Sequence, residues 1–322
     1  MTRHACIGGI ACAFPRETRT LPELARAGLL ESDPEVLARF GFERVHIATC
    51  ETPFELALAA ARDVLQETDT DPDDVDLLLY GGTPGIHAFT ASPDPAQASK
   101  ALRTSERFQY PAARLQYELG LGRAAVIGLD QLACTTLLAA VRVARALCLA
   151  DGVRRALCVA SEFYPADAGR EALFNCTSDA ACALLVEADG ARNRIVAATH
   201  VTKGYYWECD ALRNEIVASY FPTARHVIER TLAEAGWAAD EVDWVIPHNV
   251  SRRSWDILLG LVRLPRARLW DANIARRGHT LAGDNFINLR DALAAGDIQP
   301  GQKLLLFSYG YGAHWTGLAL ES

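Results

Sequence analysis

The sequence predicts an α/β protein built from two copies of one unit around a largely parallel sheet. Short apolar runs alternate with longer amphipathic segments over most of the 322 residues, as expected of strands and helices that follow each other. The chain also resembles itself: 71–84 and 238–250 both read as an acidic turn, Val-Asp and an apolar strand. Asp243 follows Asp76 by 167 positions.

The individual elements follow from length and pattern. Runs of about six to eight apolar residues are typical of strands that are buried on both faces of a sheet. Longer segments with a helical spacing of apolar residues predict the intervening helices. The predicted strands are 125–130, 156–162, 244–248 and 303–310, and the clearest predicted helices are 54–68 and 223–236.

A second pair of segments repeats in the same order. The stretch 134–163 reads helix, Asp-Gly turn, strand, and the stretch 279–310 reads helix, Gly-Asp turn, strand. Two ordered matches indicate a duplication, which we divide into halves 1–170 and 171–322. Because no long Pro/Gly/Ser linker separates these halves, we expect them to pack together.

Composition narrows the function. The net charge of −8 argues against a general affinity for nucleic acid or for an anionic membrane. No run approaches the roughly 20 apolar residues of a membrane span, and the start has no long signal-type region. The nine cysteines show no Cys-x-x-Cys or similar metal spacing. We therefore expect reduced thiols, no metal and a cytoplasmic protein.

Cys134 is the strongest candidate for chemistry. A predicted strand ends near Asp130, and an apolar helix begins at about Thr135. Unpaired N–H groups and the helix dipole favour a thiolate at such a position, and the thiolate is the nucleophilic form of cysteine. The alternative is a small buried hydrophobic residue.

Two further segments carry polar candidates. His248 follows a strand, where α/β sheets usually place their active sites, although a histidine that caps a nearby helix fits as well. In GHTLAGDN, His279 and Asp284 precede a helix that begins near Asn285. Asp284 fits an ordinary helix cap and also a carboxylate that orients a histidine.

The C-terminal turn FSYGYGAHWTG (307–317) has glycines that let a backbone approach a ligand. Such a turn can offer an N–H group to a developing oxyanion.

In this order, the four segments resemble the ketoacyl-acyl-carrier-protein synthase III family over essentially the whole chain. FGFERVHIA (40–48) and LFNCTSDAACALLV (173–186) add to the likeness, although the second lacks the two glycines of the family's F-G-D-G-A. The resemblance implies the duplicated thiolase fold: βαβαβαββ halves in five α-β-α-β-α layers. It also implies a homodimer.

The resemblance also assigns roles by position. Cys134 matches the acyl-accepting cysteine and His248 the catalytic histidine. The backbone N–H groups of Cys134 and of Tyr311 or Gly312 match the oxyanion hole. Arg253 matches a residue that docks the acyl carrier protein; for Arg253 and its neighbour Arg252, a solvated helix start is an equally good interpretation.

One departure from the family pattern changes the expected reaction. The family has Asn in a Gly-Asn-Thr context, where this chain has His279. In decarboxylative condensation His and Asn both donate to a thioester carbonyl, and one such donor contributes about 2.7–4 kcal/mol. A carboxylate that orients a histidine instead makes a base for a hydroxyl or amine.

The leading hypothesis is therefore an acyltransferase of the subgroup that forms C–O bonds in natural-product biosynthesis. Cys134 would take an acyl group from an acyl carrier protein or coenzyme A thioester. An acceptor hydroxyl or amine, deprotonated by His248 with Asp284 orienting it, would then receive the acyl group. His279 would orient His248 or contact the acceptor.

Two alternatives stay open: condensation that forms a C–C bond, and a non-catalytic partner subunit that keeps the fold. The expected partners are the thioester donor and a small-molecule acceptor, with no further cofactor. Aromatic residues in 85–111 and 204–216 would either shape an acceptor cleft or cover the core.

Overall fold

The computed structural model describes residues 3–82, 110–173 and 175–322. It confirms the α/β fold class and contains a nine-stranded central sheet. The strands of this sheet are β1 (Ala5–Ala13), β4 (Leu77–Gly81), β5 (Ala125–Leu129), β6 (Arg155–Glu162), β9 (Ala180–Ala188), β10 (Arg194–Thr202), β11 (Trp244–Pro247), β12 (Lys303–Gly310) and β13 (His314–Glu321).

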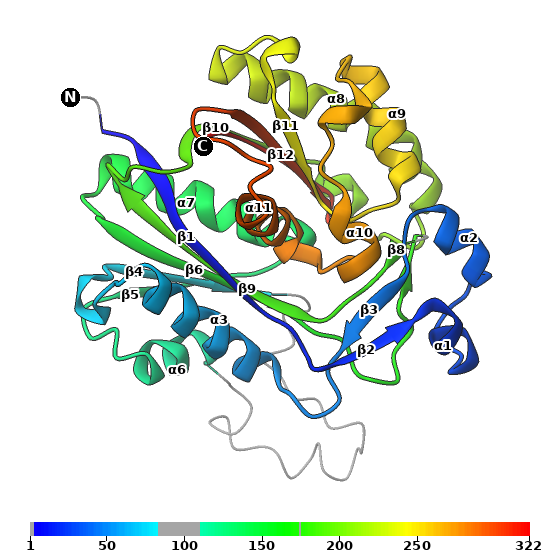
Figure 1. The fold of residues 1–322 in the computed structure, drawn as a ribbon, viewed down its shortest axis with the longest axis horizontal. Coiled ribbons are helices and arrows are strands. Elements are labelled where there is room, and N and C mark those ends of the chain that lie inside the picture. Colours follow the sequence, from blue (N-terminus) through cyan, green and yellow to red (C-terminus); the bar gives the residue numbers. More distant parts are fainter. Residues whose placement is uncertain (1–2, 83–109, 174) are drawn as a thin grey trace.

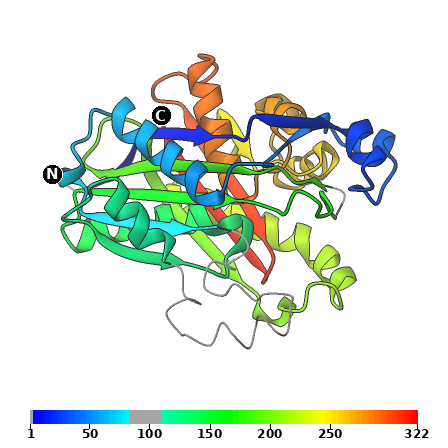
Figure 2. The same ribbon diagram turned by 90° about the horizontal axis from the view of Figure 1, so that it is seen from below.

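The other elements are shorter or lie on the faces of the sheet. The small strands are β2 (Glu17–Thr20), β3 (Arg44–Ile47), β7 (Glu171–Ala172) and β8 (Asn175–Cys176). The helices are α1 (Leu21–Arg26), α2 (Pro34–Arg39), α3 (Pro53–Glu67), α6 (Pro111–Glu118), α7 (Thr136–Ala150), α8 (Arg213–Ala235), α9 (Arg252–Val262), α10 (Ala272–Arg277) and α11 (Asp284–Ala294). Figure 2 shows α1 and the β2–β3 pair at the end of the molecule away from the N-terminus.

The strand order repeats. In the first half it is β5-β4-β6-β9-β1, and in the second half β11-β12-β13-β10. β4 is parallel to β5 and β6, whereas β9 is antiparallel to β6 and β1; β11, β12, β13 and β10 repeat this pattern. The counterpart of β5 is reduced to one parallel bridge between Val245 and Leu269. The sheet is therefore a duplicated unit.

The division between the halves lies later in the chain than residue 170. β9 begins at Ala180, yet it pairs along its length with β1 and β6 of the first half. Among the described strands, the two half-sheets are joined by the pairing of β1 with β10, where Cys6 lies opposite Arg194. A cut at 170/171 would separate β9 from its own sheet, so the first unit extends to the turn at 189–193.

Five layers are visible in Figure 1. The strands alternate the faces they present: Leu78 packs toward α3 and α6, whereas Leu77 and Leu79 pack toward α7 and α11. In the second half Leu305 faces α8 and α9, whereas Leu304 faces α7 and α11. The layers are thus α3/α6, first half-sheet, α7/α11, second half-sheet and α8/α9.

Equivalent hydrogen bonds support the repeat that the sequence predicts. The Asp76 carboxylate accepts the backbone N–H of Arg155 at the start of β6. The Asp243 carboxylate accepts the N–H of Lys303 at the start of β12, the matching strand. Asp76 therefore aligns β4 with β6, and Asp243 aligns β11 with β12. This shared role explains why the same Val-Asp precedes β4 and β11.

The central helices start in the same way. Each follows one turn of 3₁₀ helix, Ala133–Thr135 before α7 and Leu281–Gly283 before α11. In both turns the first residue has a positive φ, 46° at Ala133 and 54° at Leu281. The two turns lie in contact, so the N-termini of the central helices meet in the middle of the molecule.

One helical segment, Ala133–Ala150, is long and apolar enough to cross a membrane by length and composition. Half of it is buried inside the protein. Its side chains Leu137, Leu138 and Val141 pack between the two half-sheets. This segment is therefore apolar because it is a core helix that both half-sheets cover.

Candidate active site

Cys134, His279 and Asp284 form a line of hydrogen-bond contacts where the central helices meet. The Cys134 Sγ lies 3.4 Å from His279 Nε2, and His279 Nδ1 lies 2.6 Å from Asp284 Oδ2. All three residues are buried, and Cys134 is 8% exposed. Because a carboxylate only accepts, Nδ1 carries the hydrogen and Nε2 is the atom that exchanges a proton with the thiol.

Asp284 is saturated with donors. Its Oδ1 accepts the N–H and the hydroxyl of Thr280, each at 2.6 Å. Its Oδ2 accepts the backbone N–H of Asn249 at 2.6 Å as well as His279 Nδ1–H. These four bonds fix the carboxylate in one orientation and offset the cost of burying its charge.

The position of Cys134 follows from its turn. The hydroxyl of Ser308 on β12 donates to the Cys134 carbonyl at 3.0 Å, which ties the nucleophile's turn to the second half. Gly310 lies against the same turn: a Cβ atom there would be 3.0 Å from Cys134 N and 2.7 Å from the Leu132 carbonyl oxygen. A side chain at Gly310 would thus crowd the backbone N–H of the cysteine.

His279 is held by the first half although it belongs to the second. Its N–H donates to the Cys176 carbonyl at 2.7 Å, and its own carbonyl accepts the Ser178 N–H at 2.9 Å. Gly278, with φ +66°, permits this approach, since a Cβ there would lie 3.0 Å from the Cys176 oxygen. The segment around 176–178, which lacks the family's glycines, therefore clamps the histidine.

The predicted pairing of Asp284 with His248 is wrong. The His248 Nδ1 lies 3.2 Å from the Phe307 carbonyl oxygen, and both Asp284 oxygens are occupied by His279, Thr280 and Asn249. The physical reason is chain geometry: His279 precedes Asp284 by one tight turn, whereas His248 lies at the end of β11. The position of His248 at a strand's carboxyl end agrees with the prediction.

The two histidines differ in charge. Burial first, and then a positive charge on His279, lower the pKa of His248 to about 3 against the opposing effects of Asp284 and the Phe307 carbonyl. For His279, burial also lowers the pKa, but the charges of Asp284 and Cys134 and the hydrogen bonds to them outweigh it, so its pKa stands well above the usual value. His248 is therefore neutral, and His279 is the histidine that takes up protons.

The residues predicted for the oxyanion hole follow a glycine, Gly310, that lies against the turn of Cys134. Tyr311 and Gly312 follow β12 directly after Gly310. Burial and the nearby Cys134 charge raise the pKa of Tyr311 to about 12. The pKa values of Tyr164 and Tyr309 are also raised, by burial first and in part by Cys134. The charge of Cys134 thus acts on three tyrosines, two of which stand in the sequence motif Tyr-Gly-Tyr-Gly.

The two arginines at the start of α9 differ. Arg252 is tied down: its Nε lies 2.8 Å from Asp271 Oδ2, and its side chain packs against Gly41. Arg253 is exposed to solvent. Of the pair, Arg253 is the more exposed.

Two adjoining cavities approach the site. One, of about 240 Å³, has Tyr309, Asn175 and Ser254 in its wall. The other, of about 260 Å³, has Tyr311 in its wall. Leu173, Arg213 and Ile216 line both. From the segment 204–216, Arg213 and Ile216 line these cavities, whereas its aromatic residues, which were predicted to shape a cleft or cover the core, line neither cavity. Residues 85–109 lie outside the described residues.

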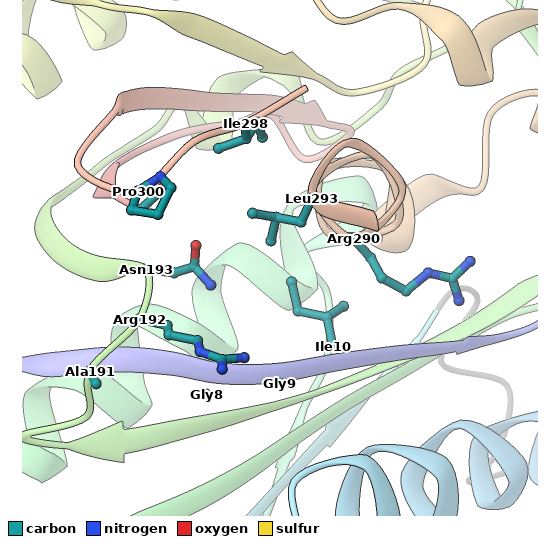
Figure 3. A pocket seen from close by; sticks show the side chains of 11 residues that line it. Gly8, Gly9, Ile10, Ala191, Arg192, Asn193, Arg290, Leu293, Ile298 and Pro300 are labelled. Atoms are coloured by element: carbon teal, nitrogen blue, oxygen red, sulfur yellow. The ribbon is translucent and has the colours of Figure 1, made fainter. Parts of the chain in front are cut away.

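Another cavity, of about 570 Å³, lies elsewhere. It lies between β1 and the C-terminal end of α11, with Arg192 and Leu293 in its wall (Figure 3). None of its lining residues belongs to the cysteine–histidine–aspartate line. Within the described ranges, no three His, Cys, Asp or Glu side chains gather in a way that would hold a metal ion.

Comparison with known proteins agrees with this geometry. Residues 232–322 match the family 3-oxoacyl-[acyl-carrier-protein] synthase III C terminal. Over their full lengths, the chain and the β-ketoacyl-[acyl-carrier-protein] synthase III of Sphingopyxis alaskensis are 28% identical; the Methylococcus capsulatus protein of that name is 25% identical, also over 100% of both chains.

Solved structures show the same fold. The 3-oxoacyl-[acyl-carrier-protein] synthase III of Aquifex aeolicus superposes with a TM-score of 0.83 at 20% identity, over 99% of this chain and 100% of the other. The acyltransferase ChlB3 superposes with a TM-score of 0.82 at 20% identity, over 99% and 97%.

The fold is that of the solved synthase III structures, and the buried cysteine site lies where its two units meet. In sequence, the chain is similar over its whole length to proteins named β-ketoacyl-[acyl-carrier-protein] synthase III, and its residues 232–322 carry the C-terminal segment of that family.

Proposed function

We propose that this enzyme moves an acyl group from an acyl carrier protein or coenzyme A thioester to a hydroxyl or amine of a natural-product acceptor, such as a sugar of a glycosylated polyketide. The observation that carries the proposal is His279, which lies between the Cys134 sulfur and the Asp284 carboxylate. The similarity to ChlB3, an acyltransferase by name, agrees with it.

The first half-reaction loads the enzyme. The Cys134 thiolate attacks the thioester carbonyl carbon, and the tetrahedral oxyanion receives hydrogen bonds from the N–H groups of Cys134 and of Tyr311 or Gly312. The bond to the donor sulfur then breaks, and the leaving thiolate takes the proton of the His279 imidazolium. The products are the acyl-Cys134 enzyme with neutral His279 and the free donor thiol.

The second half-reaction delivers the acyl group. His279 Nε2 takes the proton of the acceptor hydroxyl or amine while the heteroatom attacks the acyl carbonyl. Collapse of the tetrahedral intermediate expels the Cys134 thiolate and restores its pairing with the His279 imidazolium. Asp284 holds the imidazole with Nδ1–H toward itself and stabilises the imidazolium.

The same arrangement disfavours condensation. In the acyl-enzyme, neutral His279 has its hydrogen on Nδ1, bound to Asp284, so Nε2 presents a lone pair. A thioester carbonyl also presents lone pairs, and it needs donors. The names of the full-length relatives nevertheless favour β-ketoacyl synthesis as the second candidate, and the test includes it.

The test follows both half-reactions by mass. The enzyme is incubated with acyl-coenzyme A or acyl carrier protein, and intact mass is expected to show one acyl adduct that Cys134→Ala loses and Cys50→Ala, at an exposed cysteine, keeps. The loaded enzyme then receives a glycosylated alcohol or a malonyl thioester. An ester product supports the proposal. Carbon dioxide with a β-keto product overturns it, and a thiol that no donor labels indicates a non-catalytic subunit.

We propose that Arg253 docks the carrier. It is exposed and adjoins Ser254 in the wall of the 240 Å³ cavity that contains Tyr309. Arg253→Glu is expected to raise KM for acyl carrier protein about tenfold by placing like charges together, with little change for a small thioester that lacks the protein. Arg263→Glu, at the other end of α9, is the matched control. Equal KM values for Arg253→Glu and wild type would remove this residue from the docking site.

We also propose a homodimer formed through β5. Within the described residues β5 hydrogen-bonds only to β4, and its apolar side chains are partly exposed, with Ile127 at 38%. Such an edge is a template for pairing with a second copy. Sedimentation is expected to show a dimer for wild type and for Ile257→Lys, and a monomer for Ile127→Lys. A monomeric wild type would rule the interface out.

A further inference from the structure

His248 is a buried histidine whose outer nitrogen has no partner. It is 1% exposed, and its Nε2 makes no hydrogen bond within the described residues. The ring stands edge-on to Trp255, Phe307 and His279, with a centroid separation of 6.2 Å from His279. A buried polar atom without a partner costs free energy, so this nitrogen calls for a ligand.

The tautomer of His248 follows from its one partner. Nδ1 faces the Phe307 carbonyl at 3.2 Å, and a carbonyl oxygen only accepts, so Nδ1 carries the hydrogen. The same oxygen accepts from Asn285 Nδ2 at 3.0 Å, which confirms its orientation as an acceptor. In a neutral ring Nε2 then bears a lone pair. This nitrogen can accept a hydrogen bond and cannot donate one.

The ring is held in this orientation. Trp255 Nε1–H donates to the His248 carbonyl at 2.9 Å, which anchors the backbone at the end of β11. Turning the ring over would point a C–H group at the Phe307 oxygen and lose the hydrogen bond that Nδ1 donates there. The lone pair on His248 Nε2 is therefore present before an acceptor binds.

The next step rests on the proposed acyl transfer. Given that reaction, the two histidines define which hydrogen-bonding groups the acceptor must carry. His279 Nε2 takes the hydrogen of the reacting group, and His248 Nε2 is a second acceptor in the same buried site. A single alcohol has one O–H hydrogen and cannot serve both nitrogens.

We infer that the acceptor carries two neighbouring hydrogen-bond donors: a reacting group that His279 deprotonates and a second X–H that His248 Nε2 binds. A vicinal diol, as on a sugar ring, and a primary amine share this chemistry. His248 is thus a positioning residue that selects the acceptor, and the covalent steps remain those of Cys134 and His279. A carbon nucleophile that presents a thioester carbonyl to both lone pairs is rejected.

The first experiment measures transfer from the acyl-Cys134 enzyme to three probes: a methyl glycoside with a free vicinal diol, the same glycoside with the neighbouring hydroxyl replaced by hydrogen, and the glycoside with an amine at the reacting position. We expect kcat/KM for the diol to exceed that for the deoxy compound by about 10- to 100-fold, the effect of leaving a buried acceptor unpaired. A higher rate for the amino compound than for the deoxy alcohol means that a primary amine also supplies the two hydrogen-bond donors.

Variants separate positioning from folding. His248→Asn keeps an N–H group for the Phe307 carbonyl and lacks an acceptor at Nε2, so the diol-to-deoxy ratio is expected to fall toward one. His248→Gln, whose amide oxygen reaches the Nε2 position, is expected to recover part of the ratio. If His248 had a structural role alone, the variants would lower kcat/KM equally for the diol and the deoxy compound. An unchanged ratio would therefore overturn the inference.

A second measurement is independent of turnover. Nitrogen-15 spectra of histidine-labelled enzyme are expected to show His248 with hydrogen on Nδ1 and none on Nε2; hydrogen on Nε2 would overturn the inference whatever the reaction. Equal transfer to the diol and the deoxy glycoside refutes the inference and leaves the proposed function standing. No transfer to any probe, with carbon dioxide from malonyl thioester, refutes both.

Discussion

Asp284→Asn is expected to slow transfer to the acceptor by about 10³- to 10⁴-fold, while an acyl adduct still forms on Cys134 during long incubation. An amide that keeps its oxygen toward the two Thr280 donors turns its NH₂ group toward His279 Nδ1. The imidazole then carries its hydrogen on Nε2, where it cannot take a proton from the acceptor; loss of the correct tautomer has an effect of this size in serine proteases. Single-turnover mass spectrometry measures the decay of the adduct.

The matched control is Asp291→Asn, on the same helix α11. Asp291 bonds to Asn273 and Arg290 and has no contact with His279. A loss of transfer in both variants would point to helix stability instead of the tautomer. Unchanged transfer in Asp284→Asn would remove the carboxylate from the mechanism. We also expect a loss of stability of about 1–3 kcal/mol, because the Asn249 N–H would face an amide NH₂ group.

His279→Asn is expected to lower transfer to a hydroxyl acceptor by about 10²- to 10⁴-fold, the usual contribution of a general base. The amide has no lone pair that takes a proton at neutral pH. The pH dependence identifies the base: in wild type the transfer rate rises as pH increases and His279 loses its proton. The variant is expected to lose this rise. A variant that keeps both the rate and the profile would contradict the assignment of His279.

Asp284 also sets the position of that rise. The carboxylate charge is among the causes that raise the pKa of His279 against the opposing effect of burial. Removing the charge lowers the pKa, so the midpoint of the rate–pH curve is expected to move to lower pH in Asp284→Asn, even as the plateau falls. A shift to higher pH would mean that another group titrates.

Much of the fold was readable from the sequence because the signals are local. Predicted strands at 125–130, 244–248 and 303–310 agree within one residue with β5, β11 and β12. The repeated Val-Asp at Asp76 and Asp243 reflects one structural role, the alignment of parallel strands. The boundary between the two units was harder to predict. β9 is a continuous apolar run, and the pattern of such a run does not show which strands it pairs with.

The sequence singled out four residues that the structure brings together, but the pairing it predicted among them does not occur. Cys134, His248, His279 and Asp284 all occupy the same buried region. The pairing of Asp284 with His248 failed because the role of catalytic histidine was assigned to His248 by family resemblance, and the nearest carboxylate was then paired with it. In this chain His279 lies five residues before Asp284 in one turn. Its Nδ1–H donates to Asp284 Oδ2.

The sequence by itself determined the α/β alternation, the duplication and a cysteine at the start of an apolar helix, since periodicity and short motifs record these features directly. Only the tertiary structure decided which histidine meets the thiol. Cys134 and His279 are 145 residues apart, and they approach because the two units bring the N-termini of α7 and α11 together. The tautomer of His248 was likewise decided by the Phe307 carbonyl on a neighbouring strand, a contact that no local pattern specifies.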